Sequence, residues 1–138
     1  MALVADASAI LALALNEEEA RYGDAVIDAI VADEGFVPAL FWFEIRNALL
    51  MSERRKRFTP ERTDQFLADL EMLPIVVDPQ PRWEATIGLA RRHQLSVYDA
   101  AYLELAQRKA VSLATIDAAL KRAAESVSIT VFQTTRRK

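Results

Sequence analysis

The chain has no cysteine, a single histidine (His93), and only 3 glycines and 5 prolines among its 138 residues. Without cysteine there can be no disulfide bond, no thiolate metal ligand and no cysteine nucleophile. A lone histidine argues against a zinc site and against a histidine-based catalytic triad. Because glycine is so scarce, the sequence contains no glycine-rich phosphate loop, which argues against nucleotide binding of the P-loop or dinucleotide kind.

A positively charged N-terminal segment is also missing, since the first Lys or Arg is Arg21 and Asp6 interrupts the first apolar stretch. A secretion signal needs a positive segment and then an unbroken apolar run. The stretch is too short to cross a bilayer. We therefore expect a soluble, cytoplasmic protein without membrane association. With 52% hydrophobic residues, the chain is predicted to form one domain spanning residues 1–138.

The net charge of −3 argues against a nucleic-acid-binding domain, because such domains are usually basic. The charge is nevertheless unevenly distributed. Basic residues form two clusters, one made of Arg54, Arg55, Lys56 and Arg57 and one made of Arg136, Arg137 and Lys138. Each cluster is either a solvated surface or a local patch that attracts a polyanion despite the negative total.

Short apolar segments alternate with longer segments of helical periodicity along the whole chain. Strands are predicted at residues 3–5, 36–38, 74–77, 111–114 and 128–132. Helices are predicted at residues 7–15, 20–32, 40–54, 82–92, 96–108 and 118–124, and a further helix is predicted to start at Pro60 after a Thr59 cap. This alternation predicts an α/β fold with a mostly parallel sheet of four to five strands, covered on both faces.

Two acids, Asp6 and Asp117, each follow a predicted buried strand and precede a predicted helix. Ligands of open α/β sheets bind outside the carboxyl ends of the strands, where both acids would lie. Taken singly, each acid is equally well explained as a helix cap that accepts hydrogen bonds from first-turn amides. Two such acids in one small sheet favour a shared site.

Two further acids lie on predicted helices. Glu44 falls on or beside the apolar stripe of its helix, where a carboxylate is costly unless it is paired. It is either a salt-bridge partner of an arginine or an acid directed at a polar cleft. Asp99 follows Ser96 at the spacing of a capping box, and it is either part of that cap or a site residue at a helix N-terminus.

Four carboxylates in one cleft would repel one another, and a divalent cation would remove this repulsion. Oxygen ligands alone suit Mg²⁺ or Mn²⁺ better than zinc. A natural substrate for such a site is a phosphodiester, which a metal-activated water can attack. The pattern therefore predicts metal-dependent hydrolysis of a phosphodiester.

Four segments, at residues 4–8, 44–49, 96–103 and 113–120, together resemble the PIN-domain ribonucleases, specifically the toxins of VapBC-type toxin–antitoxin systems. The resemblance extends over nearly the whole chain. It implies a three-layer α/β/α fold and a catalytic site made of Asp6, Glu44, Asp99 and Asp117. In this site Asp6, Asp99 and Asp117 would hold the metal, and Glu44 would position or deprotonate the attacking water.

The same resemblance implies supporting residues and partners. Ser8 and Thr115 are expected to orient Asp6 and Asp117, and Asn47 is expected to orient Glu44. The substrate would be structured cellular RNA, such as tRNA or rRNA, whose cleavage arrests translation. A cognate VapB-type antitoxin would cover the acidic cleft with a basic side chain, and homodimerisation is expected. Both basic clusters are candidates for contact with the RNA backbone.

Two other classes remain as alternatives. A receiver-like signalling domain also binds Mg²⁺ with strand-end acids, and Asp78 would be its phosphorylated residue. Against this class, receivers carry adjacent acids after the first strand and a lysine after a late strand, whereas this chain has Asp6 alone and Thr115 to Asp117 at those places. A non-catalytic interaction module is the third class, and its function would survive removal of the acids.

Overall fold

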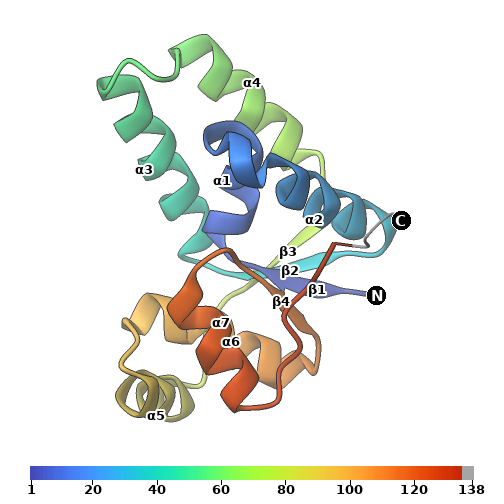
Figure 1. The fold of residues 1–138 in the computed structure, drawn as a ribbon, viewed down its shortest axis with the longest axis vertical. Coiled ribbons are helices and arrows are strands. Elements are labelled where there is room, and N and C mark those ends of the chain that lie inside the picture. The colour runs from blue at the N-terminus through green and yellow to red at the C-terminus, as the bar shows by residue number, and fades with distance from the viewer. Residues whose placement is uncertain (135–138) are drawn as a thin grey trace.

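Four parallel strands form the centre of the structure, a computed structural model that describes residues 1–134 (Figure 1). The strands are β1 (Leu3–Ala5), β2 (Gly35–Pro38), β3 (Ile75–Asp78) and β4 (Ser112–Ala114), in the order β3-β2-β1-β4. Strand β1 is buried along its whole length, as expected for a strand covered on both faces.

Helices cover both faces of this sheet, so the architecture has three layers. They are α1 (Ala7–Leu15), α2 (Ala20–Ala32), α3 (Phe41–Arg54), α4 (Pro60–Glu71), α5 (Trp83–His93), α6 (Val97–Lys109) and α7 (Ala118–Ser126), with a short 3₁₀ helix η1 (Glu17–Glu19). Figure 1 shows α1 to α4 on one side of the sheet and α5 to α7 on the other. The predicted α/β/α class with a parallel sheet is confirmed.

Helix boundaries follow local signals in the sequence. Thr59 caps α4 by accepting a hydrogen bond from the Arg62 amide at 3.2 Å, and Pro60 occupies the first helical position, as predicted. Helices α5 and α6 end at Gln94 and Ala110, both in the left-handed conformation typical of helix C-termini.

The order of the strands creates a switch point between β1 and β4. From β1 the chain moves outward to β2 and β3 through α1 to α4, and it then returns through α5 and α6 to the opposite side of β1. In such sheets the connections leave the carboxyl ends of the two neighbouring strands in opposite directions, which opens a crevice there. Asp6 follows β1 and Asp117 follows β4, so both acids lie at this crevice.

The predicted strand at residues 128–132 is wrong in extent, because the structure has only an isolated bridge there between Val131 and Leu113. The amide of Ile129 bonds back to Ala124 of α7, and Ser128 has a positive φ of 62°. The chain therefore turns too sharply after α7 for a regular strand to begin. Within residues 1–134, no helix is long and apolar enough to cross a membrane.

Candidate active site

Asp6 is a buried carboxylate, 4% exposed, at the junction between β1 and α1. One oxygen, Oδ1, accepts hydrogen bonds from the Ala9 amide at 2.9 Å and from Ser8 Oγ at 2.6 Å. The other oxygen, Oδ2, accepts a short hydrogen bond from Thr115 Oγ1 on the β4 side. Asp6 thus caps α1 and also joins the ends of two strands, so the capping interpretation is confirmed and a catalytic role for Asp6 stays a prediction.

The hydroxyls of Ser8 and Thr115 connect Asp6 to the Asp117 loop. Ser8 Oγ accepts a hydrogen bond from the Ile116 amide at 3.2 Å, and Thr115 Oγ1 accepts one from the Asp117 amide at 3.0 Å. Asp117 in turn caps α7 through the Leu120 amide at 2.8 Å. This network holds the loop after β4 against the start of α1.

Glu44 lies half-buried in the first turn of α3, and its hydrogen-bond partner is a tyrosine. Tyr102 Oη donates to Glu44 Oε1 at 2.5 Å, and no described arginine pairs with this carboxylate. Asn47, which was expected to orient Glu44, is exposed and has no hydrogen bond to it among the described residues. Burial, the Glu44 hydrogen bond and the charges of Glu44 and Asp6 all raise the pKa of Tyr102, so it stays protonated and donates.

Tyr102 contacts a candidate site acid although none of the sequence patterns above singles it out. Tyr102 is 1% exposed, whereas Tyr98, four residues earlier, is 63% exposed. The available signal was its position three residues after Asp99, which places both side chains on one face of the helix.

Asp99 occupies the first turn of α6, and its amide donates to the Ser96 cap at 3.0 Å. Its carboxylate is half-buried near the other acids. Burial raises the pKa of Asp99, and the negative charge of Asp117 raises it further. Ser96 therefore supplies the hydroxyl cap of α6, and its side chain opposes the rise in the pKa of Asp99.

Asp99 interacts electrostatically with each of the other three acids. Burial raises the pKa of Asp6 to about 6 despite its hydrogen bonds, and the charge of Asp99 contributes to the rise. Burial and then Asp99 likewise raise the pKa of Glu44 against the lowering effect of Tyr102. Among the described residues, none of the four acids forms an ion pair. The charges of these four carboxylates are therefore not compensated by a basic side chain among the described residues.

The donor set fits a hard divalent cation that keeps much of its hydration. The candidate side-chain ligands are carboxylates, and Mg²⁺ and Mn²⁺ prefer such oxygen ligands. Within residues 1–134, no three acidic or imidazole groups converge into a ready-made coordination shell. Magnesium commonly binds through one or two carboxylates and retains several waters, so a closed cage of protein ligands is not required.

Asp78 and Glu104 form a second group of acids. Unlike the four candidate site acids, they are paired with an arginine. Arg108 donates to both oxygens of Asp78 at 2.9 and 2.8 Å and to Glu104 at 2.7 Å. This network ties the end of β3 to α6, and the hydrogen bonds of Arg108 lower the pKa of Asp78. Because Arg108 occupies both Asp78 oxygens, nothing favours the receiver-like alternative.

The first predicted RNA-contact cluster lies away from Glu44 along α3. Arg54, Arg55, Lys56 and Arg57 are exposed at the end of α3 and in the turn before α4. Ten residues of helix separate Arg54 from Glu44, a distance of about 15 Å along the axis. Contact of this cluster with RNA stays a prediction. The second cluster, at residues 136–138, lies outside the described residues.

Together, the fold and the site define a small α/β protein with a parallel sheet, in which unpaired acids follow the neighbouring strands β1 and β4. Comparison with known families matches residues 3–126 to the PIN domain, and the chain belongs to the PIN-domain family. Ribonuclease VapC3 of Pyrobaculum aerophilum is 32% identical over 121 residues, covering 85% of this chain and 90% of that protein. The family inferred from the four acidic segments is thus confirmed.

Two solved structures share the fold. The crystal structure of PAE2754 from Pyrobaculum aerophilum superposes with a TM-score of 0.71 at 25% identity, covering 95% of this chain and 83% of that one. FitAcB from Neisseria gonorrhoeae superposes with a TM-score of 0.65 at 16% identity, covering 95% and 96% of the two chains. The second likeness concerns the fold alone.

Proposed function

We propose that this protein is a metal-dependent endoribonuclease that hydrolyses phosphodiester bonds in cellular RNA. The observation that carries the proposal is the hydrogen-bonded junction at the carboxyl ends of β1 and β4, where Ser8 and Thr115 connect Asp6 to the Asp117 loop. The carboxylates of Asp6, Glu44, Asp99 and Asp117 have no ion-pair partner among the described residues. The likeness to ribonuclease VapC3 supports the same reaction.

In the proposed mechanism, Asp6, Asp99 and Asp117 would hold a Mg²⁺ or Mn²⁺ ion. When bound, the cation supplies charge neutralisation and lowers the pKa of a water molecule. Glu44 orients the attacking water and accepts its proton through Oε2, because Oε1 is occupied by Tyr102. A raised pKa suits this role, since a general base works best with a pKa near the operating pH. Ser8 and Thr115 keep Asp6 in place.

The biological setting is part of the proposal. By likeness to VapC-type proteins, this chain is the toxin of a toxin–antitoxin pair, acts in the cytoplasm on tRNA or rRNA, and arrests translation. A cognate VapB-type antitoxin inhibits it, and the negative cleft suits a basic antitoxin side chain. The protein is also proposed to form a homodimer, which light scattering of the purified chain would test.

The test is cleavage of total cellular RNA by protein freed of any partner. We expect cutting with Mg²⁺ or Mn²⁺ and none in excess chelator, with cut sites mapped by sequencing the new RNA ends. Asp6→Asn should abolish cleavage while circular dichroism shows an intact fold. Asp28→Asn, an exposed acid on α2, is the matched control and should cleave normally. Full activity in excess chelator would contradict the proposal.

A further inference from the structure

The chain after α7 runs alongside the outer edge of β4, the strand at one end of the sheet. The Leu113 amide donates a hydrogen bond to the Thr130 carbonyl at 2.9 Å, and the Phe132 amide donates one to the Leu113 carbonyl at 2.8 Å. These two bonds make up the isolated parallel bridge described above. If this parallel ladder continued by one more step, the Thr115 amide would donate directly to the Phe132 carbonyl.

The hydroxyl of Tyr22 takes the place of this next ladder bond. Tyr22 Oη accepts a hydrogen bond from the Thr115 amide at 3.3 Å and donates one to the Phe132 carbonyl at 2.7 Å. Among the described residues, no direct bond joins the Thr115 amide to the Phe132 carbonyl. A phenolic hydroxyl can donate and accept at the same time, so it can bridge an amide and a carbonyl at the point where two strands separate.

Tyr22 lies in the first turn of α2, where its ring and its protonation state both favour this bridge. The ring meets that of Phe132 edge-on, with 6.0 Å between the ring centroids. Burial raises the pKa of Tyr22 to about 12, and the charges of Asp6 and Glu19 add to the rise, whereas the hydrogen bond from the Thr115 amide opposes it. The hydroxyl therefore keeps the proton that it donates to Phe132.

Thr115 connects this hydroxyl to the candidate active site. Thr115 Oγ1 donates to Asp6 and accepts a hydrogen bond from the Asp117 amide at 3.0 Å. The amide of Thr115 is thus held by Tyr22, while its side chain contacts Asp6. A shift of the Thr115 backbone would move the hydroxyl that orients Asp6 together with the start of the Asp117 loop.

The alternative role for Tyr22 is to fasten the C-terminal segment and nothing more. The bond to the Phe132 carbonyl would be sufficient for that role. The second bond, from the Thr115 amide, ends at the residue whose side chain contacts Asp6. This second bond favours a role in the site over a role in fastening alone.

We propose that Tyr22 is a positioning residue of the candidate site: its hydroxyl holds the Thr115 backbone at the end of β4, and Thr115 in turn orients Asp6 and the Asp117 loop. This inference rests on the proposed ribonuclease function and extends it to α2, a helix that carries none of the four acids. A displacement of about 1 Å in a catalytic group can lower a rate about 100-fold, so the loss of this support should act on kcat.

Amide hydrogen exchange, measured by NMR on the metal-free protein, tests the geometry without any cleavage. Tyr22→Phe keeps the aromatic ring and removes the hydroxyl. We expect the Thr115 amide to exchange about fivefold faster in this variant, because it loses its acceptor. Tyr98→Phe, which removes an exposed hydroxyl, should leave this amide unchanged. Equal exchange of the Thr115 amide in the wild type and in Tyr22→Phe would overturn the proposal.

Cleavage kinetics test the consequence for the site. We expect Tyr22→Phe to lower kcat about tenfold and to leave KM within about twofold of the wild type. In the Thr115→Val protein, which lacks the hydroxyl that reaches Asp6, Tyr22→Phe should lower kcat by less than about twofold. In the Thr115→Ser protein, which keeps a hydroxyl, Tyr22→Phe should have its full effect. Equal losses of kcat in all three proteins would assign Tyr22 to folding alone and overturn the proposal.

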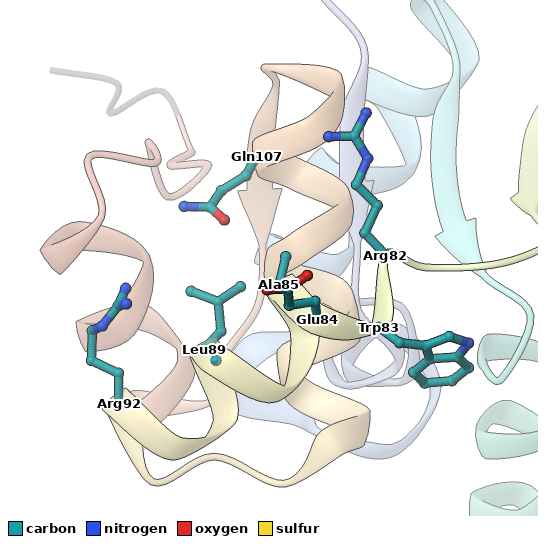
Figure 2. A pocket seen from close by; sticks show the side chains of 8 residues that line it. Arg82, Trp83, Glu84, Ala85, Leu89, Arg92 and Gln107 are labelled. Atoms are coloured by element: carbon teal, nitrogen blue, oxygen red, sulfur yellow. The ribbon is translucent and has the colours of Figure 1, made fainter.

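A hollow of about 660 Å³ between α5 and α6 supplies a control position away from this junction (Figure 2). Its lining contains none of the four acids and none of the residues that hydrogen-bond to them. Gln107→Ala removes an exposed polar side chain there and should cleave normally. If the wild type cleaves RNA and Tyr22→Phe cleaves as well as Gln107→Ala, the positioning role is overturned and the ribonuclease proposal stands. If the wild type cleaves no RNA, the ribonuclease proposal fails and the positioning role fails with it.

Discussion

Tyr102 donates a 2.5 Å hydrogen bond to Glu44, and this bond joins helix α6 on one face of the sheet to helix α3 on the other. The two residues are 58 positions apart in the chain. The bond fixes one oxygen of Glu44 and leaves the other oxygen for the cleft. It also lowers the pKa of Glu44, opposing the effect of burial.

Removing the Tyr102 hydroxyl should impair the proposed action of Glu44 as the general base. We expect Tyr102→Phe to lower kcat/KM for RNA about tenfold or more, since hydrogen bonds to charged groups contribute about 1.5–3 kcal/mol. Without the donor the pKa of Glu44 rises, so the base loses its charge at a higher pH. The acidic limb of the kcat/KM profile should therefore move to higher pH. Tyr98→Phe, on the same helix, is the control, and an unmoved acidic limb in Tyr102→Phe would contradict this role.

Asp6 should make the metal-free protein less stable as the pH rises. Its folded-state pKa of about 6 lies above the ordinary value of 3.8, so the folded state favours the protonated form. The cost of ionisation is absent below about pH 4, grows between pH 4 and 6, and is complete above pH 6, reaching at most about 3 kcal/mol. Asp6→Asn removes this dependence.

Urea unfolding in chelator measures this effect. The stability of Asp6→Asn relative to the wild type should increase from about pH 4 to about pH 7, following the sign of the pKa shift. A difference that stays constant over this range would show that Asp6 ionises normally in the folded protein.

Asp99→Asn should raise the melting temperature of the metal-free protein by a few degrees. The substitution removes the half-buried charge of Asp99, which raises the pKa of both Asp6 and Glu44. The gain should shrink in Mg²⁺, because the cation compensates the same charge in the wild type. Glu61→Gln, an exposed first-turn acid on α4, is the matched control for helix-terminus effects. A lower melting temperature for Asp99→Asn would instead identify this carboxylate as a structural cap.

Alanine substitution at two glycines should change the stability of the protein in opposite directions. A Cβ at Gly23 on α2 would approach the backbone nitrogen of Leu13 on α1 to 2.8 Å, so Gly23→Ala should force the helices apart and cost about 1–3 kcal/mol. A Cβ at Gly88 in α5 would meet nothing within 4 Å, so Gly88→Ala should stabilise the protein by up to about 1 kcal/mol. Chemical denaturation of the pair measures both effects, and equal responses would contradict the close packing of α1 on α2.

Much of the architecture was predictable because it depends on local patterns. The apolar run of β1, the Thr59 cap and the alternation of strands with helices each carry their signal within a few residues. The prediction of a strand at residues 128–132 was wrong in extent because the apolar composition of this segment resembles that of a strand. The turn at Ser128 and the hydrogen bond from Ile129 to Ala124 depend instead on where α7 ends. Apolar composition alone does not distinguish an edge segment with one bridge from a paired strand.

The sequence by itself determined the fold class and the presence of four acids at strand and helix ends, because both rest on short-range periodicity and spacing. It also determined the family, through the resemblance of four segments that together extend over nearly the whole chain. Only the tertiary structure decided which groups surround those acids. It assigned Tyr102 to Glu44 in place of Asn47, and Arg108 to Asp78, since both pairings join residues distant in the chain. Such contacts depend on how helices pack across a sheet, and no local pattern encodes them.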